Sequence, residues 1–422
     1  MKAARSDGHR LVVAHGVNTA GESLTATALT IQLFGDSQSF LIVAGLLACH
    51  TVPQMVWSGR AGRTADRSDP LGLARRALLV LTALLLLLAA VPTNRVLILA
   101  LIVAIASVYT FADSALFSLI PRVSRGDEVR RRSLQADMSA ARWIGSALGA
   151  LAAGWLTLRH GYRAPVAIDG LTYLVAAGII GRLTVDRAPA AGAAEGEEEP
   201  PVSRLALLRL YPRVAMGIAV LCSSIVFLGT AGILMIGFVE HTLHGDAALF
   251  GGLESTYMWG ILAGTLVVRL LVRRLPPMAT LLGACGAGGL LLFLQAWLAN
   301  RAATFPLYGA AGVAHGMDSL SMRTLLTEEA DDAVIGQLFS AFYAAAAASE
   351  LASFLLGATL GELLPVRWAL AAGGLSAVAA VVVAGAAIAA GRARASELGL
   401  GRRSRSAAAG AADGLGQDLE AG

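Results

Sequence analysis

Stretches of about twenty apolar residues recur along the whole chain, and short polar segments separate them. An α-helix needs roughly 20 apolar residues to cross a hydrocarbon layer about 30 Å thick, so each stretch is long enough to span a membrane. The pattern therefore predicts an all-α integral membrane protein with twelve transmembrane helices. We expect these spans at 11–34, 39–58, 77–93, 96–120, 139–158, 165–185, 214–239, 248–268, 278–299, 303–325, 334–362 and 366–390.

The spans form two sets of six, because one long polar segment interrupts them at 186–213. This segment contains Ala, Gly, Pro and an acidic run, which is typical of a solvated linker. The predicted regions are a cytoplasmic N-terminus at 1–10, six-helix bundles at 11–185 and 214–390, the cytoplasmic linker at 186–213, and a disordered cytoplasmic tail at 391–422.

The placement of arginine predicts the orientation of the chain, because short cytoplasmic loops retain basic residues. Lys2 is the only lysine, and the other 32 basic residues are arginines. With the N-terminus inside, the inner segments hold 27 basic residues and the outer loops hold five, while Arg142 lies within the fifth span. We therefore expect both termini in the cytoplasm. The abundance of arginine, alanine and glycine indicates a bacterial protein of the cytoplasmic membrane.

Composition excludes several classes of protein. Only 15% of the residues are charged and 56% are hydrophobic, whereas about a quarter of a soluble chain is charged. The net charge of +4 does not indicate nucleic-acid binding, because the arginines are scattered over short loops. Cys49, Cys222 and Cys285 have no disulfide or zinc-ligand spacing, and the chain has no phosphate-binding Gly-Lys loop. We expect no metal, no cofactor and no use of ATP.

A short motif, Gly62-Arg63-Thr64-Ala65-Asp66-Arg67, follows the second span. This G-x-x-x-D-R sequence resembles the signature between helices 2 and 3 of the major facilitator superfamily, and it occupies the same position. The resemblance implies a gating loop formed by Gly62, Arg63, Asp66 and Arg67. In one conformation the Asp66 carboxylate would pair with arginine across the inner face. The alternative is a basic inner loop that is capped by an aspartate.

Four further stretches resemble the drug and siderophore exporter branch of that family, which includes enterobactin-exporter-like proteins. They are GESL in the first span, ARWIGSALG in the fifth, AIDGLTYLVAA in the sixth and GMDSLSMRTLLTEE at the tenth. The resemblance covers about residues 10–390. It implies two six-helix bundles that rock around a central site, each built from inverted three-helix repeats.

The sequence departs from the family pattern at three positions and in one span. Pro70 stands where an arginine pair is expected, Ser146 stands where proline normally follows Gly145, and Gln337 stands where arginine normally follows Gly336. The fourth span also lacks the membrane arginine that many proton-coupled exporters of the family carry. Coupling to protons is therefore an expectation that the motifs only partly support.

Ionisable side chains are confined to some of the spans. The third and ninth spans contain none, the twelfth contains only Arg367 at its outer end, which is counted with the outer loops, and the resemblance places those helices at the periphery. A charge in the membrane interior is unfavourable unless it is paired or hydrated, so the ionisable groups of the other spans mark a polar interior. The candidates for the substrate cavity or for proton coupling are His15, Asn18, Glu22, Asp113, Arg142, Glu254, His315, Asp318 and Glu350.

Spacing relates some of these candidates. His15, Asn18 and Glu22 stand at i, i+3 and i+7, so they share one helix face, which we expect to line the cavity. A glutamate on that face could take up and release a proton as access alternates. His315 and Asp318 stand at i and i+3 and should face the cavity from the other half. In each case the alternative is a structural role with satisfied partners.

The remaining candidates have less certain roles. Asp113 is expected either in the cavity or as the partner of Arg142, and the second role is favoured because a membrane arginine needs a partner. Asp169 lies on a helix that is usually peripheral in the family, so we assign it a structural role. Glu254 and Glu350 remain open between a cavity role and a structural one.

Glycines repeat at four-residue spacing in three spans, and such spacing permits close helix contact in lipid. In the resembled fold, helices 2, 5, 8 and 11 meet between the two halves. The glycines are therefore expected at the half-to-half interface, with ordinary packing as the alternative. They are Gly145 and Gly149, Gly260 and Gly264, and Gly357 and Gly361.

These observations predict a secondary active transporter that exports a small amphipathic molecule, such as a drug, antibiotic or siderophore, by alternating access and proton antiport. The alternative is an importer or facilitator of a small solute on the same fold. An enzyme is not expected, because His15, His50 and His315 have no ligand-like spacing, and a sensor would need a sizeable soluble domain. The expected partners are the substrate, protons and the lipid bilayer, without nucleic acid, and we expect a monomer.

Overall fold

The computed structural model describes residues 2–91, 94–184, 208–271, 275–330 and 334–397, and within these ranges the chain is helical, with no strand. The first group of helices, which we call the N-terminal half, comprises α1 (Lys2–Ser37), α2 (Phe40–Arg67), α3 (Pro70–Ala90), α4 (Arg95–Ser124), α5 (Glu128–His160) and α6 (Arg163–Ile180). The second group, the C-terminal half, comprises α8 (Pro212–Leu228), α9 (Thr230–Gly237), the π-helix η1 (Phe238–Thr242), α10 (Ala247–Leu271), α11 (Pro277–Leu298), α12 (Arg301–Glu329), α13 (Ile335–Leu363) and α14 (Val366–Glu397).

Each of the predicted spans coincides with helical structure, and the all-α fold class is confirmed. In the described residues, eight helical stretches are long and apolar enough to cross a membrane. They are α2, α3, α4, α6, the stretch Pro212–Thr242, α11, α13 and α14. The four other helices, α1, α5, α10 and α12, are those that carry Glu22, Arg142, Glu254 and Asp318. That these four also cross the membrane remains a prediction.

One predicted span, 214–239, is interrupted. The helix pauses at Gly229, where an added Cβ would press against the side chain of Ser353 on α13. The Thr230 hydroxyl donates a hydrogen bond to the Phe227 carbonyl at 2.6 Å, which competes with regular helix hydrogen bonding. The stretch then ends in the π-helix η1, where the Leu243 amide bonds to the Phe238 carbonyl.

Short polar caps begin several helices. The Asn94 side chain accepts hydrogen bonds from the amides of Val96 and Leu97 at the start of α4. The Asn300 side chain accepts one from the amide of Ala302 at the start of α12. Such caps satisfy amides that have no partner within the helix. They explain why long helices can be joined by connections of only a few residues.

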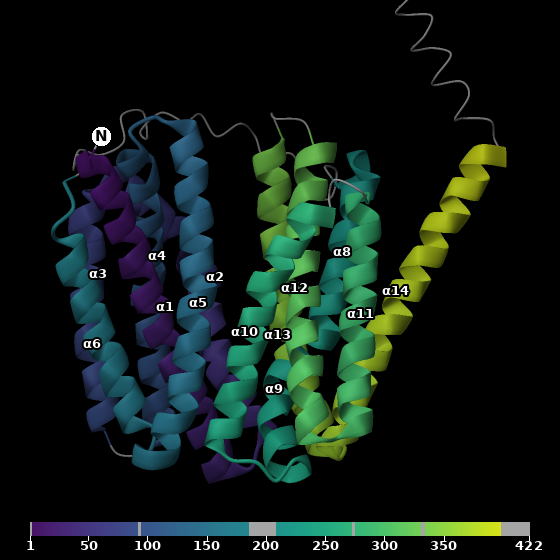
Figure 1. The fold of residues 1–422 in the computed structure, drawn as a ribbon, viewed down its shortest axis with the longest axis horizontal. Helices are drawn as coiled ribbons and strands as arrows, with labels where there is room; N and C mark the ends of the chain where they lie inside the picture. The colour runs from purple at the N-terminus through teal and green to yellow at the C-terminus, as the bar shows by residue number, and fades with distance from the viewer. Residues whose placement is uncertain (1, 92–93, 185–207, 272–274, 331–333, 398–422) are drawn as a thin grey trace, which may run out of the picture.

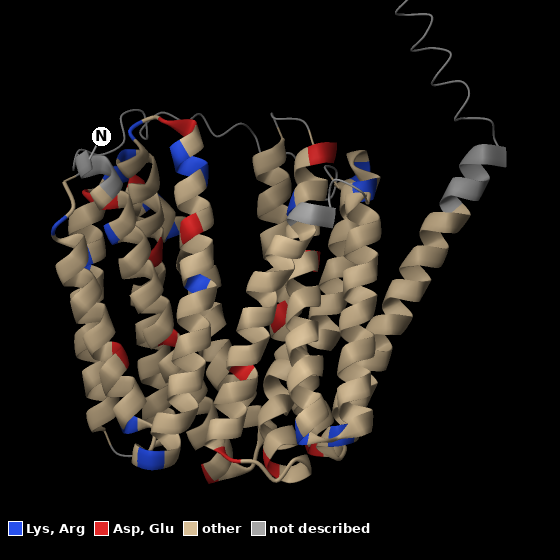
Figure 2. Cartoon of the chain, in the orientation of Figure 1, with Lys and Arg blue, Asp and Glu red and all other residues tan. Residues whose placement is uncertain are grey.

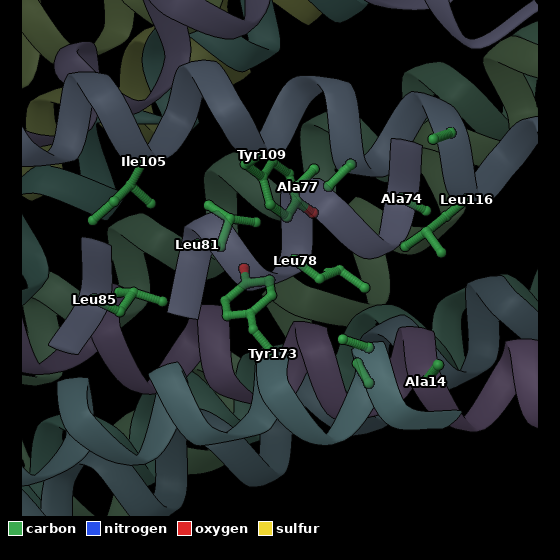
Figure 3. Packing of buried hydrophobic residues seen from close by; sticks show 14 of the residues in the cluster. Ala14, Ala74, Ala77, Leu78, Leu81, Leu85, Ile105, Tyr109, Leu116 and Tyr173 are labelled. Atoms are coloured by element: carbon green, nitrogen blue, oxygen red, sulfur yellow. The ribbon is translucent and has the colours of Figure 1, made fainter. Parts of the chain in front are cut away.

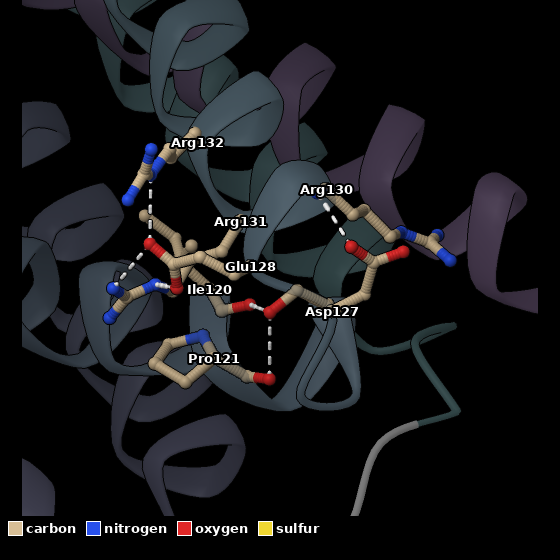
Figure 4. Close-up of polar contacts among 8 residues, drawn as sticks. Ile120, Pro121, Asp127, Glu128, Arg130, Arg131 and Arg132 are labelled. Carbon is tan, nitrogen blue, oxygen red and sulfur yellow. Dashed lines mark hydrogen bonds and ion pairs between the residues drawn. The ribbon is translucent and has the colours of Figure 1, made fainter.

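The start of α5 is a polar network at the surface (Figure 4). The Asp127 side chain accepts a hydrogen bond from the amide of Arg130 at 3.1 Å, which caps the helix. Glu128 forms ion pairs with Arg131 at 2.8 Å and with Arg132 at 2.9 Å. Hydrogen bonds from Arg131 and then from Arg132 lower the pKa of Glu128 below its ordinary value of 4.5. The network orders the first turn of α5 outside the predicted span.

The helices form two groups that approach each other at the lower end of Figure 1 and stand apart at its upper end, where α1 begins. Within the N-terminal half, the buried core joins α3, α4 and α6, with Leu78, Leu81 and Leu85 near Tyr109 and Tyr173 (Figure 3). Across the halves, α5 packs on α10 and α2 packs on α13. These are the second, fifth, eighth and eleventh spans, so the expected contact helices are confirmed.

Charged residues gather at the two ends of the helices, and only a few lie in between (Figure 2). No described residue of α3 or α14 belongs to the lining of the central cavity, and the charged residues of these two helices lie near the helix ends, such as Arg75 and Arg76 in α3 and Arg367 in α14. The helix α14 lies at the outer edge of its half in Figure 1. The charge-free α11 contributes only Gly288 and Leu292 to that cavity.

Two predicted regions fall largely outside the described residues. They are the linker at 186–213, of which the structure describes only the part from residue 208, and the tail at 391–422. The helix α14 extends to Glu397, past the predicted end of the last span at 390, so the first residues of the expected disordered tail are helical.

Candidate functional site

A cavity of about 670 Å³ lies between the two halves. Residues of α1 and α2 line one side, and residues of α8 to α13 line the other. Its ionisable lining residues are His50, Glu254, His315, Asp318 and Glu350, and no lysine or arginine belongs to the described lining. His315 and Asp318 therefore line the cavity as predicted, and Glu254 and Glu350, for which a cavity role and a structural role were both open, line it as well.

Aromatic rings form a row on the C-terminal wall of the cavity. The ring of Tyr257 on α10 stacks on that of Tyr308 on α12, with centroids 4.7 Å apart, and lies 6.1 Å from the ring of His315. A carboxylate stands at each end of the row. The Tyr308 hydroxyl donates to Glu254 Oε1 at 3.1 Å, and His315 Nδ1 lies 3.7 Å from Asp318 Oδ1.

Close contact between α10 and α12 positions this row. The backbone of Gly260 meets that of Gly309 and Gly312, and Gly264 meets Val313 and Gly316, leaving no room for a Cβ at either position. The expectation that Gly260 and Gly264 lie at the half-to-half interface is therefore wrong. They pack within the C-terminal half because α12, rather than the other half, covers this face of α10.

The same correction applies to most of the other glycines. Gly145 and Gly149 pack against the backbone of α1, in their own half, and Gly357 packs against Thr230 and Ile233 of its own half. Only Gly361 touches the other half, through the ring of Phe40. Four-residue spacing identifies a face that permits close contact, but it does not identify the neighbour.

A pair of glycines absent from the predictions makes a close contact between the halves. The Cα of Gly154 on α5 lies against Gly251 on α10, and a Cβ on either glycine would collide with the opposite backbone. No spacing rule singled out these two residues, because each stands alone on its helix face.

A polar cluster lies in the N-terminal half, beside the cavity. Glu22 Oε1 lies 3.3 Å from His50 Nε2, and Glu22 Oε2 accepts a hydrogen bond from the Tyr109 hydroxyl at 3.1 Å. Arg142 interacts electrostatically with Glu22, Asp113 and Tyr109. Among the described residues no direct ion pair joins Arg142 to Asp113, so their predicted pairing is present only as a longer-range attraction.

The face of α1 that carries His15, Asn18 and Glu22 does not line the cavity, contrary to expectation. The cavity is lined instead by the adjacent face, including Ser23, Thr27 and Thr30. His15 is 2% exposed and its ring lies edge-on to Phe117 of α4, 5.8 Å away. Asn18 is buried as well, and its Oδ1 has no hydrogen-bond partner in the described structure. The three residues do share one face, but that face packs within the half.

Asp169 takes the structural position expected of it. Its side chain is buried and accepts a hydrogen bond from the Thr25 hydroxyl of α1 at 2.6 Å. The Thr172 hydroxyl donates a second, longer bond at 3.3 Å. Asp169 therefore ties α6 to α1 on the side away from the cavity.

The motif Gly62–Arg67 was expected in a loop, but it forms the last turns of α2, which ends at Arg67. The connection is short because Asp69 caps α3 and Pro70 is the first residue of that helix. Asp66 is exposed and forms no ion pair with any described residue, so the expected contact is open in this conformation. Pro70 thus has a local explanation, as a residue well suited to begin a helix.

One end of the cavity, which we call the closed end, is sealed by residues of both halves. The ring of Phe40 lies against Gly237 and Gly361, two positions where a Cβ would collide with it. Phe34 packs on Phe40 with ring centroids 4.9 Å apart. The seal is apolar and depends on glycine at both facing positions.

Polar contacts surround this apolar seal. Ser39 Oγ donates to Glu362 Oε1 at 2.7 Å, and Gln38 Nε2 donates to Glu240 Oε1 at 2.8 Å. Both bonds join the connection between α1 and α2 to the C-terminal half. They lie at the end of the helices opposite to the motif Gly62–Arg67.

Several residues of the site were missed by sequence reasoning. Tyr257, Tyr308 and Phe40 are uncharged, so a search for buried ionisable groups passes over them. A usable signal did exist for two of them. Tyr308 and His315 are seven residues apart, and Glu254 and Tyr257 are three apart, which places each pair on one helix face in a chain with few aromatic residues.

Several solved structures of transporters have the same overall fold as this chain. A nucleoside transporter, NupG, superposes with a TM-score of 0.70 at 12% identity, over 90% of this chain and 99% of that one. A peptide transporter, POT, gives 0.71 at 12% identity, over 91% and 96%. A bacterial homologue of the human lysosomal transporter Spinster, in an inward-facing and unoccupied conformation, gives 0.65 at 15% identity, over 91% and 96%.

Sequence comparison supplies the family. No curated protein matches the chain in sequence. The family model of the Major Facilitator Superfamily matches residues 11–350, which is most of both halves. With two helical halves around a central cavity, this chain belongs to the major facilitator superfamily of multi-pass membrane transporters.

Proposed function

We propose that this protein is a secondary active transporter that exports a small amphipathic molecule by alternating access, in exchange for protons. One observation carries the proposal: the central cavity lies between two halves that meet at the closed end and stand apart at the other. A transporter of this kind must open and close each end in turn around one site. The apolar seal at Phe40 is suited to such a reversible closure.

Orientation and direction follow from the arginine pattern and the exporter-like stretches. With both termini in the cytoplasm of a bacterium, the closed end faces outward and the cavity opens inward. An inward-open cavity with an apolar wall can take up amphipathic molecules from the cytoplasm or the inner leaflet. The alternative, an importer or facilitator, uses the same geometry in the opposite direction.

Proton coupling is proposed at Glu22. This carboxylate contacts His50, which lines the cavity, and Tyr109, so a proton could pass between the cavity and Glu22 through one histidine. Arg142 interacts electrostatically with Glu22 and supplies the positive charge of this cluster. The motif Gly62–Arg67 is retained as the inner gate, with Asp66 unpaired in the present conformation. The protein is proposed to work as a monomer.

Proteoliposomes with an imposed pH gradient test the proposal. Panels of antibiotics, siderophores and organic dyes should include at least one compound whose movement accelerates with the gradient. Glu22→Gln should lower gradient-driven transport by about tenfold or more, because the substitution removes the proton site. Glu328→Gln, at the exposed end of α12, is the matched control and should transport like the parent protein. Proton-driven export is wrong if no compound moves, or if movement ignores the gradient.

A further inference from the structure

The two halves carry matching pairs of rings at equivalent positions. His50 and Tyr257 are each the eleventh residue of the second long helix of their half, α2 and α10. Tyr109 and His315 are each the fifteenth residue of the fourth, α4 and α12. The ring centroids of His50 and Tyr109 lie 6.4 Å apart in the N-terminal half, and those of Tyr257 and His315 lie 6.1 Å apart in the C-terminal half. Each half therefore holds one histidine–tyrosine pair at the same depth, with the two residue types exchanged.

The charges around the two pairs differ. In the N-terminal half, Arg142 is close enough to offset the carboxylates of Glu22 and Asp113. In the C-terminal half, Glu254 and Asp318 adjoin the row of rings, and the described cavity lining contains no lysine or arginine to offset them. The negative charge of the cavity is therefore concentrated on one wall.

Glu350 adds a third carboxylate from α13. Its side chain is exposed to the cavity and interacts electrostatically with His50 and His315. Low-dielectric walls focus the field of such charges into the space between them. A cation entering the cavity is attracted, and an anion is repelled.

The row of rings also favours a ligand of a particular shape, namely one with a flat ring system. Tyr308 and His315 are two helical turns apart, roughly 10 Å along α12, and Tyr257 lies between them. Tyrosine faces attract cations and stack on flat ring systems. The cavity volume of about 670 Å³ is within the usual range for a pocket that holds a drug-sized molecule.

An unsatisfied hydroxyl points to the same space. Ser224 lines the cavity and is 3% exposed, and its Oγ has no hydrogen-bond partner by geometry in the described structure. Its side chain interacts with the thiol of Cys285, a group that forms only weak hydrogen bonds. A buried hydroxyl without a partner is unfavourable unless a ligand or water supplies one.

We propose that the C-terminal wall binds an organic cation with a planar ring system, between the row Tyr308, Tyr257 and His315 and the carboxylates Glu254, Asp318 and Glu350. This inference rests on the proposed transport function and names its substrate class. It also assigns different functions to the two halves. The cluster around Glu22, whose two carboxylates are partly offset by Arg142, serves coupling, and the C-terminal wall, whose lining contains no lysine or arginine, serves recognition.

Binding to the purified protein in neutral-lipid nanodiscs tests this assignment, with ethidium as the planar cation and fluorescein as the planar anion. Fluorescence anisotropy should show saturable ethidium binding and much weaker fluorescein binding. Glu254→Gln and Tyr257→Leu should each weaken ethidium binding by about tenfold. Tyr257→Phe, which keeps the ring, should weaken it by less than about threefold.

Two further variants distinguish a loss of ethidium binding from a loss of folding. Glu350→Gln alters a side chain that is exposed in the cavity, and it should weaken ethidium binding without changing the melting temperature. Glu328→Gln, at the exposed C-terminal end of α12, should leave ethidium binding unchanged. The proposal is overturned if fluorescein binds more tightly than ethidium, or if Glu254→Gln, Tyr257→Leu and Glu350→Gln all bind ethidium like the parent protein.

The binding result is independent of the transport result. If ethidium binds to this wall but no pH gradient drives transport, the coupling mechanism fails and the recognition site stands. If a gradient drives transport of anionic or neutral compounds while ethidium does not bind, the transport function stands and the cation site fails.

Discussion

Individual charged residues in this protein act in two different settings. At the helix ends, groups such as Glu128 pair with neighbours one turn away on the same helix and remain in contact with water. Inside the bundle, Glu22, Asp169 and Glu254 are instead held by hydroxyl or imidazole groups from other helices. The first setting orders a local turn, whereas the second joins distant parts of the chain.

The pH dependence of stability should reveal the contribution of the surface ion pairs that Glu128 forms at the start of α5. Because Arg131 and Arg132 lower the pKa of Glu128 below 4.5, its ion pairs stabilise the folded state at pH values above about 4.5. That stabilisation is lost as the pH falls below 4.5 through the lowered pKa of the folded state. Melting temperatures of the parent protein and Glu128→Gln should therefore differ at pH 7, and the difference should shrink as the pH is lowered below 4.5. Equal values at pH 7 would contradict this account.

Pairs of helices are held together largely by glycine contacts. Gly145 and Gly149 bring α5 against α1, and Gly260 and Gly264 bring α10 against α12. In each pair a short stretch of backbone touches backbone, so van der Waals contact is closer than larger side chains would allow. These contacts fix the helices on which the candidate proton site and the ring row stand.

A single methyl group should test this packing. Gly149→Ala places a Cβ against the Ala20 carbonyl, and overpacking of this kind costs about 1–3 kcal/mol. We expect Gly149→Ala to lower the melting temperature in detergent by several degrees. Gly45→Ala is the matched control, because a Cβ at Gly45 has no atom within 4 Å, and it should melt at or above the parent temperature. The packing account fails if the two variants melt alike.

At the scale of the whole molecule, two contacts between the halves stand out among the described residues. One is the contact of α5 with α10 at Gly154 and Gly251, and the other is the closed end around Phe40. Gly154 near the end of α5 and Gly251 near the start of α10 lie on the same side of the molecule as the closed end. In the proposed alternating access, the hydrogen bond between Ser39 and Glu362, which lies across the second contact, breaks at each opening.

A reversible crosslink across the closed end should stop transport. In a background with Cys49, Cys222 and Cys285 replaced by alanine, Ser39→Cys/Glu362→Cys treated with a short bis-methanethiosulfonate reagent should lose transport. A reductant should restore it. Ser39→Cys and Glu362→Cys alone should transport normally after the same treatment. Undiminished transport by the crosslinked protein would show that this end does not open.

The sequence was sufficient to predict where the helices lie along the chain, but not which other helix or cavity each helix face contacts. Apolar runs located every helical segment because length and hydropathy are local properties. The spacing of His15, Asn18 and Glu22 correctly placed them on one face, but whether that face meets the cavity or α4 depends on how α1 is rotated in the bundle. The same limit explains why most of the glycines were wrongly predicted at the half-to-half interface, because the helix that each glycine contacts is determined by tertiary packing.

Local chemistry explains the other differences from expectation. The motif Gly62–Arg67 contains no residue that stops a helix, so α2 continues through it until Asp69 and Pro70 begin α3. The irregularity at Gly229 coincides with the close approach of Ser353 from α13, a contact that no property of the segment 214–239 reveals. The ring row of Tyr308, Tyr257 and His315 likewise requires two helices to be placed together before it exists.

The one-sided charge of the cavity has a consequence for energetics in a living membrane. When one end is closed and the other is filled with water, most of the transmembrane voltage falls across the closed end. In the proposed alternating access, a change of the open end moves this voltage drop to the other side of Glu254, Asp318 and Glu350. Each charge that crosses the full field contributes about 2.3 kcal/mol per 100 mV, so charged carboxylates on this wall would make the empty carrier responsive to voltage, and the proposed bound cation would reduce that response.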